Sequence, residues 1–254
     1  MRAVVIRGHR MNAQMLEKDM DLTTGSANKN PFKYGYFNSV CSDQGEAEFA
    51  AIRVMTCGLS SQKFGKIINY AVKCMDPRNI YCEIGTFTGY TLLCAALHNS
   101  RQCLGIDNFS STFYSPETAK NVRARVHANL GHFSFPNVSF VEEDYKKVAL
   151  DGDRIGVFLV DAEHTREECF NCLEWGHRYL APYAIVFVDD ISACGVYGGV
   201  EDWMALHPSE VRELFKVHVH YPQTGDIDDD ELGRQRANPV SYNGFCILEF
   251  TRKK

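Results

Sequence analysis

Short hydrophobic runs alternate with longer amphipathic segments along the last two thirds of the chain. Each run has the length of a strand and is followed by polar or turn residues, and seven of them occur: residues 79–85, 102–107, 138–144, 155–162, 184–190, 215–222 and 244–250. The middle runs are continuously apolar rather than alternating, which is typical of parallel strands covered by helices on both faces. The pattern therefore predicts one sheet of seven strands.

The segments between these runs indicate how the strands connect. Three of them have helical length and spacing, namely 91–100, 116–131 and 166–180. Alternating strands and helices predict a doubly wound, Rossmann-like α/β fold with helices on both faces of the sheet. Residues 222–243 break the alternation, because they carry turn residues and charges without a helical stripe. We therefore expect a mostly parallel sheet whose last strand is antiparallel.

The first 75 residues follow a different pattern. A polar, aperiodic stretch at 11–37 precedes one or two helical segments at 45–74. We predict that residues 1–75 form an N-terminal lid or helical cap on a domain spanning 76–254, the two making one compact unit. Four aromatic residues in the first stretch either cover a ligand or pack in a core or dimer interface: Phe32, Tyr34, Tyr36 and Phe37.

Composition narrows the class of protein. The chain has 254 residues, 45% of them hydrophobic, and a formal net charge of -5. These values are ordinary for a globular protein, and the lack of a dense Lys and Arg run argues against nucleic acid or membrane partners. No apolar stretch reaches the ~20 residues that cross a bilayer. Arg7, His9 and Arg10 break the first apolar run, so we expect a cytoplasmic protein.

The ten cysteines are scattered, and several lie inside apolar runs. Free buried thiols fit this distribution best. Cys169 and Cys172 form a CxxC pair without a second pair. A structural zinc ion needs four ligands, so we expect none there.

A glycine turn follows the first predicted strand. The segment YCEIGTFTGYT places Glu83, Gly85 and Gly89 between a strand and a helix. The dinucleotide fingerprint GxGxxG needs its second glycine two residues after the first, and Phe87 stands there, so a nicotinamide cofactor is disfavoured. The plainest interpretation is a glycine turn beside a strand-end carboxylate.

Together with Asp107 at the end of the second strand, this segment resembles the E-x-G-x-x-x-G pattern of enzymes that bind S-adenosylmethionine. A carboxylate there offers two acceptor oxygens to the vicinal hydroxyls of the ribose, and the resemblance also places Asp144 near the adenine. The contacts that we expect for this cofactor are Glu83, Gly85, Thr86, Phe87, Gly89, Tyr90, Thr91, Asp107, Asp144 and Asp161.

Three aspartates end the fourth and fifth predicted strands: Asp161, Asp189 and Asp190. Adjacent parallel strands open onto one crevice at their carboxyl ends, so these carboxylates are expected to converge. Like charges in a cleft repel unless a cation or protons compensate them. We predict a bound divalent ion, Mg2+ ahead of Mn2+ or Ca2+. The plainer alternative is that Asp190 caps a turn and Asp161 faces water.

From about Tyr81 to Trp203 the chain resembles the metal-dependent class I O-methyltransferases, most closely the macrocin O-methyltransferase-like enzymes that methylate sugar hydroxyls. The matching motifs are EIGTFTGYT, GID, VDAEHT and VDDISACGVYGGVEDWM, in which an acidic pair precedes a glycine-containing loop and a helix start. The resemblance implies that Asp161, Asp189 and Asp190 hold the metal. Catechol and caffeoyl-CoA O-methyltransferases usually have Asn as the third ligand, so Asp190 favours the sugar-type branch.

Methyl transfer to a hydroxyl also needs a base. Sugar-type relatives carry an acidic residue two positions after the first metal ligand, matched here by Glu163. Catechol-type relatives carry Lys three positions after it, matched by His164. His164 has the better unperturbed pKa for a base near pH 7 and is ranked slightly ahead. The alternative is that His164 only contacts the cofactor or caps the next helix.

These features predict an enzyme: an S-adenosylmethionine-dependent, divalent-metal-dependent O-methyltransferase (EC 2.1.1) for a small polyhydroxylated molecule such as a sugar or natural product. Two alternatives stay open. One is a metal-independent methyltransferase for an amine or carboxylate, and the other is a cofactor-binding partner protein without catalysis. The expected partner is a small-molecule acceptor, a homodimer is left open, and no motif identifies the acceptor.

Overall fold

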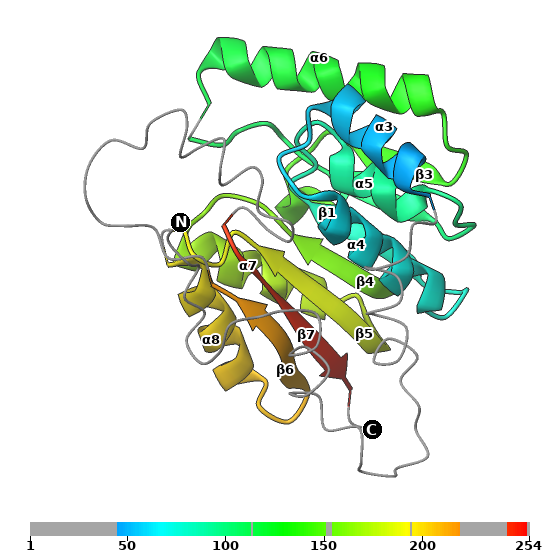
Figure 1. The fold of residues 1–254 in the computed structure, drawn as a ribbon. Coiled ribbons are helices and arrows are strands. Elements are labelled where there is room, and N and C mark those ends of the chain that lie inside the picture. The colour runs from blue at the N-terminus through cyan, green and yellow to red at the C-terminus, as the bar shows by residue number, and fades with distance from the viewer. Residues whose placement is uncertain (1–44, 113, 151–153, 194, 219–242, 253–254) are drawn as a thin grey trace, which may run out of the picture.

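Seven strands form one sheet at the centre of the computed structural model, which describes residues 45–112, 114–150, 154–193, 195–218 and 243–252 (Figure 1). The strand order is β3-β2-β1-β4-β5-β7-β6. Five neighbouring strands are parallel, and β7 runs antiparallel between β5 and β6. The predicted Rossmann-like fold with an antiparallel last strand is confirmed. The strands are β1 Ile80–Ile84, β2 Cys103–Ile106, β3 Val138–Val141, β4 Ile155–Val160, β5 Leu180–Asp189, β6 Val211–Val217 and β7 Phe245–Thr251.

Helices connect the parallel strands and precede the sheet. Several begin where a hydroxyl side chain accepts a hydrogen bond from a backbone N–H of the first turn, as Ser61, Ser115 and Thr165 do. Of the one or two helices predicted at 45–74, the structure has two, because Cys57 ends the first in a left-handed conformation. The helices are α3 Glu46–Thr56, α4 Gln62–Cys74, α5 Tyr90–Ala96, α6 Pro116–Phe133, α7 Arg166–His177 and α8 Val196–Leu206, with a 3-10 turn at Tyr145–Lys147.

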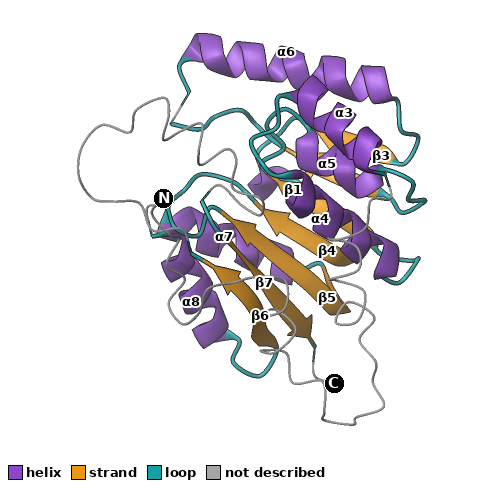
Figure 2. Cartoon of the chain, in the orientation of Figure 1, coloured by secondary structure: helices purple, strands orange, loops and turns teal. Residues whose placement is uncertain are grey.

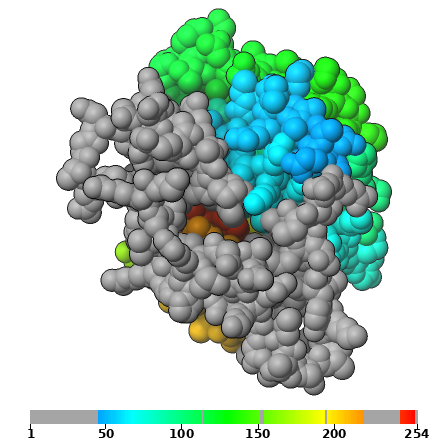
Figure 3. Space-filling model, in the orientation of Figure 1, coloured from blue at the N-terminus to red at the C-terminus, as the bar shows by residue number. Residues whose placement is uncertain are grey.

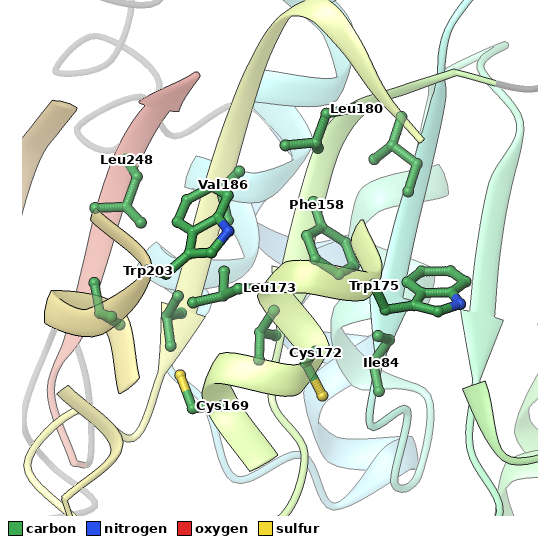
Figure 4. Packing of buried hydrophobic residues seen from close by; sticks show 14 of the residues in the cluster. Ile84, Phe158, Cys169, Cys172, Leu173, Trp175, Leu180, Val186, Trp203 and Leu248 are labelled. Carbon is green, nitrogen blue, oxygen red and sulfur yellow. The ribbon is translucent and has the colours of Figure 1, made fainter. Parts of the chain in front are cut away.

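The strands are buried because helices cover both faces of the sheet (Figure 2). Successive side chains of a strand point to opposite faces, so Tyr81 packs with α4 and α5 whereas Cys82 packs with α7 and α8. On the second face, Phe158 of β4 meets Trp175 of α7, and Trp203 of α8 is fully buried (Figure 4). Burying each such side chain stabilises the fold by about 1.5–3 kcal/mol.

The cysteines of this core are free thiols, as predicted. Cys169 and Cys172 lie on the buried side of α7 among apolar side chains (Figure 4). Burial raises the pKa of both thiols, that of Cys169 to about 12. Thiols that stay protonated in an apolar layer have the role of small hydrophobic residues.

The glycine-containing loop predicted after Asp190 ends at Gly195, which has φ 85° and directly precedes α8. α8 begins at Val196, so Gly198 and Gly199 lie inside the helix. A Cβ on Gly199 would come within 2.4 Å of the backbone oxygen of Arg166. Gly199 therefore lets α8 pack closely against α7, and this contact outweighs the low helix propensity of glycine.

The last two predicted strands form the antiparallel pair that was expected, but β6 begins at Val211 rather than at residue 215. It lies at the edge of the sheet and is only partly buried, so its sequence lacks a continuous apolar run. No helix among the described residues combines the length and the apolar character needed to cross a membrane.

α3 and α4 lie in the segment predicted to be a cap. α4 packs on β1, β4 and β5, and α3 packs against α5 and α6. Figure 3 shows α3 in blue beside α6 in green on the surface. The four aromatic residues of the predicted lid lie outside the described residues, so the division into a lid at 1–75 and a domain at 76–254 stays a prediction.

Candidate active site

A cavity of about 730 Å3 opens at the carboxyl ends of β1, β2, β4 and β5. This volume is in the range of small-molecule sites, and the position is where ligands bind in doubly wound folds. The residues predicted for the site that line it are Gly85, Thr86, Phe87, Tyr90, Thr91, Asp107, Asp144, Asp161, Glu163, His164, Asp189 and Asp190. The sheet topology therefore brings together most of the predicted residues.

The glycine turn after β1 forms one wall of this cavity. Gly85 has φ 89°, and a Cβ there would lie 1.8 Å from the backbone oxygen of Asp161. Only glycine fits such a close approach of two strand ends. Phe87 also has a left-handed backbone, with φ 48°, and its ring stacks on Tyr114 at a centroid distance of 6.1 Å. Gly89 begins α5 with φ 90° but does not line the cavity.

Asp107 holds this turn in place. Its Oδ2 accepts hydrogen bonds from the backbone N–H of Thr86 at 2.9 Å and of Phe87 at 2.8 Å, and its Oδ1 accepts one from Phe109 at 2.8 Å. Burial nevertheless raises the pKa of the Asp107 carboxyl, although the three N–H donors act against the rise. The sequence placed Asp107 at a ligand site, and the structure gives it a further role in shaping the turn.

Glu83 lies behind the turn rather than in the cavity. Its side chain is fully buried, and its Oε2 accepts hydrogen bonds from the hydroxyls of Tyr81 at 2.6 Å and Thr91 at 2.7 Å. Burial raises the pKa of Glu83 to about 7, despite these hydrogen bonds. The contacts join β1 to α5, so direct contact of Glu83 with a cofactor is not supported by its position.

The three aspartates predicted to hold a metal lie close together. Burial raises the pKa of Asp161 well above its ordinary value, and the charges of Asp189 and Asp190 raise it further. Burial, followed by the charge of Asp190, raises the pKa of Asp189 to about 8. With such pKa values, some of these carboxyl groups carry a proton unless a bound cation compensates the negative charge.

His164 belongs to this cluster. Its Nε2 lies 2.8 Å from Oδ2 of Asp190, and this hydrogen bond is the main reason that the pKa of His164 is raised. One donor atom each from Asp161, His164 and Asp190 lie within 4.8 Å of one another. Asp189 is turned elsewhere: Oδ1 accepts from the N–H of Asp190 at 3.0 Å, and Oδ2 from the Ser60 hydroxyl at 3.4 Å.

Glu163 links two loops at the edge of the cavity. Its carboxylate accepts hydrogen bonds from the backbone N–H of Thr112 at 3.2 Å and from the Thr112 hydroxyl. Partial burial acts to raise the pKa of Glu163, but the hydrogen bonds from Thr112 and Ser111 outweigh it and hold the pKa below its ordinary value. Glu163 therefore ties the loop after β2 to the loop after β4.

The remaining predicted residues have structural partners as well. The Tyr90 hydroxyl donates to the backbone oxygen of Ser61 at 3.0 Å, and Asp144 caps the 3-10 turn by accepting from the N–H of Lys146. Several lining residues had no signature in the sequence: Leu59, Ser60, Thr88, Asn108, Tyr114 and Asn243. Ser60 and Asn243 are far apart in the chain, and only the strand order places them at one cavity.

Comparison with known proteins agrees with this architecture. Residues 82–191 match a family model described as a methyltransferase domain. No curated protein matches the chain. The match extends from β1 through the turn, the cavity and the aspartate pair.

Solved structures share the fold at low sequence identity. The structure of the O-methyltransferase TomG from Streptomyces achromogenes, which is involved in tomaymycin synthesis, was determined with S-adenosylmethionine. TomG is 17% identical to this chain, with a TM-score of 0.55, and the match covers 85% of this chain and 95% of the TomG chain. An O-methyltransferase from Bacillus cereus, determined with S-adenosylhomocysteine, is 13% identical, with a TM-score of 0.54 and coverage of 87% and 97%. The O-methyltransferase NovP is 14% identical, with a TM-score of 0.51 and coverage of 74% and 79%.

The domain match and the shared fold agree with each other. Residues 82–191 match a methyltransferase domain, and the described part of the chain has a Rossmann-like fold that solved O-methyltransferases share.

Proposed function

We propose that this protein transfers a methyl group from S-adenosylmethionine to a hydroxyl of a small polyhydroxylated molecule, such as a sugar or natural product, with the help of a divalent metal ion. The observation that carries the proposal is one cavity in which the Gly85 turn faces the carboxylates of Asp161 and Asp190. Methyl transfer needs a cofactor site and an acceptor-activating site within one small volume.

The cavity residues fit the cofactor. A carboxylate has about four acceptor positions, and backbone N–H groups fill three of those on Asp107. One position is left for a ribose hydroxyl, and Asn108 lies beside it in the cavity wall. The Thr88 hydroxyl is buried without a partner among the described residues and also lines the cavity. Support also comes from the Streptomyces and Bacillus enzymes, which were determined with this cofactor or its product.

The carboxylate cluster fits a divalent ion. Asp161 and Asp190 supply oxygen donors, which Mg2+ prefers, and Mn2+ or Ca2+ would also accept them. Asp189 is the third proposed ligand, and its Oδ2 also accepts a hydrogen bond from Ser60. A nitrogen of His164 lies within 4.8 Å of an oxygen of Asp161 and of Asp190. Such an ion, when bound, would lower the pKa of an acceptor hydroxyl and fix its orientation.

The chain itself has to position the acceptor and remove its proton. Methyl transfer is an in-line displacement, so the acceptor oxygen must face the methyl carbon while a base stands beside it. We rank His164 ahead of Glu163 as this base, because Glu163 is held by Thr112 and its lowered pKa makes it a weak proton acceptor. Glu163 is then a positioning residue for the loop after β2.

Incubation with isotopically labelled S-adenosylmethionine and a pool of sugars, phenols and other hydroxylated small molecules tests the proposal. Mass spectrometry should find an acceptor that gains one labelled methyl group, and EDTA should abolish the gain until Mg2+ is restored. The Asp190→Ala variant, which has no donor atom at this position, serves as the matched negative control. Labelled product that is equally abundant in EDTA would refute the metal, and labelled amines or carboxylates in place of ethers would refute the acceptor class.

A further inference from the structure

A second group of metal-ligating side chains lies at the edge of the sheet opposite to the cavity. His177 ends α7, His207 follows α8, and Glu210 directly precedes β6. Both β5 and β6 pair antiparallel with β7, so β6 runs in the same direction as β5 and begins at the amino edge of the sheet. The cavity lies at the carboxyl edge, a strand length away.

The three side chains direct donor atoms toward one region. Nε2 of His177 lies 3.0 Å from Oε2 of Glu210, and Nδ1 of His207 lies 3.7 Å from the same oxygen. One donor atom from each lies within 4.8 Å of the others. Two imidazoles and a carboxylate are a frequent ligand set for Zn2+. The side chains of His177, His207 and Glu210 are 22%, 16% and 20% exposed, so solvent ions can reach them.

Glu174 supplies the outer hydrogen bond that histidine ligands of metals usually have. Its Oε1 lies 2.6 Å from Nε2 of His207. A ring that donates the proton of Nε2 to a carboxylate keeps Nδ1 deprotonated and available to a metal. Glu174 lies three residues before His177 on α7, so one helix face carries both an outer carboxylate and an inner ligand.

We propose that His177, His207 and Glu210 form a zinc-binding site that is separate from the cavity, with Glu174 orienting His207. The two imidazole rings stack at a centroid distance of 4.0 Å and an angle of 20°. The lone pair of an imidazole nitrogen lies in the plane of its ring, so two parallel rings cannot both direct a lone pair at the same ion. Binding of one ion by both rings must therefore tilt the rings out of their stack. The indole of Trp203 touches both rings edge-on, so its fluorescence should report the change.

Zinc titration tests this site in a full-length parent that carries Asp161→Asn and Asp190→Asn, so that the cavity carboxylates no longer compete. Calorimetry should find one Zn2+ per chain, with a shift in tryptophan fluorescence. Adding His177→Gln and His207→Gln should weaken binding at least tenfold and remove the shift. The matched control is His127→Gln, because Nε2 of His127 also lies 3.0 Å from a carboxylate, that of Glu142 on the surface, and it should not change zinc binding.

Glu174→Gln provides a second variant that keeps all three ligands, and it should weaken binding by roughly 10–100-fold. Circular dichroism and metal-free thermal unfolding check that each variant is folded. Binding by the double histidine variant as tight as in the parent, or no stoichiometric binding by the folded parent, would overturn the proposal. Neither result depends on methyl transfer, so this site and the proposed function are tested separately.

Discussion

His164 and Asp190 are joined by a hydrogen bond, with 2.8 Å between Nε2 and Oδ2, and this contact links the loop after β4 to the end of β5. Asp190 adopts a left-handed backbone, with φ 54°, as it makes this contact. The neighbouring Glu163 points instead to Thr112. Glu163 and His164, the two candidates for the catalytic base, therefore have different partners. We expect their substitution to have different effects.

His164→Gln and Glu163→Gln should separate the two roles. If His164 accepts the acceptor proton, His164→Gln should lower kcat by about 10^2–10^4 at saturating metal and cofactor. Glu163→Gln should mainly raise KM, because its amide keeps an oxygen for the Thr112 hydrogen bonds. Initial-rate kinetics of both variants check this. Wild-type turnover in both would show that neither residue is the base.

Gly85→Ala should destroy the turn. The new Cβ would overlap the backbone oxygen of Asp161, and the residue has φ 89°, so we expect more than ~2 kcal/mol of destabilisation together with loss of the cavity wall. Gly131→Ala is the matched control. No atom lies within 4 Å of a Cβ there, and the position is in α6, so this change should stabilise by about 0.5–1 kcal/mol. Chemical denaturation measures both, and equal effects would contradict the strained turn.

Glu83→Gln should remove a pH dependence of stability. In the folded chain the pKa of Glu83 is about 7 against an ordinary 4.5, so between these values the folded state holds a proton that the unfolded state has lost. Stability contributed by this group is therefore greatest below the unfolded pKa and falls as pH rises through about 7. The full change is roughly 3 kcal/mol at 1.36 kcal/mol per pKa unit.

The check is thermal or chemical unfolding of wild type and Glu83→Gln between pH 5 and 8. Gln keeps an oxygen that accepts from Tyr81 and Thr91, so the variant should fold. Its stability relative to wild type should rise with pH. A difference that stays constant over this range would show that Glu83 does not titrate in the folded chain.

Divalent ions should stabilise the cavity. A ligand that binds only the folded state raises the free energy of unfolding, and the effect grows with ligand concentration. Mg2+ should therefore raise the Tm of the wild-type protein. The shift should disappear in Asp161→Ala and in Asp190→Ala. Asp202→Ala, which removes a surface carboxylate that pairs with Arg166, should keep it. Calorimetric unfolding with Mg2+ and with EDTA measures the shift. An equal shift in all four proteins would place the ion outside the carboxylate cluster.

The features that depend on periodicity and on strand ends could be predicted from the sequence. Continuous apolar runs identified the parallel strands, and the rule that parallel strands share a carboxyl edge brought Asp107, Asp161 and Asp190 together. The direction of Glu83 was missed, although a period of two places it on the same face of β1 as Tyr81. Knowing that this face meets α5 required the positions of the helices.

Other features depend on packing between distant segments. Ser60 donates a hydrogen bond to Asp189, which lies 129 residues later in the chain, and no local sequence pattern predicts such a contact. The glycines of α8 suggested a loop, but their lack of side chains serves close approach to α7. The histidine pair at the amino edge was also beyond sequence analysis, because α7 and the turn after α8 bring it together only in the fold.

Isothermal titration calorimetry with S-adenosylmethionine tests the central claim most directly. Wild-type protein should bind one cofactor molecule per chain, with and without EDTA. Asp107→Ala should bind at least tenfold more weakly, because it removes the acceptor of the ribose and the support of the turn. Absence of binding by folded wild-type protein, or unchanged binding by folded Asp107→Ala, would contradict the proposed cofactor site.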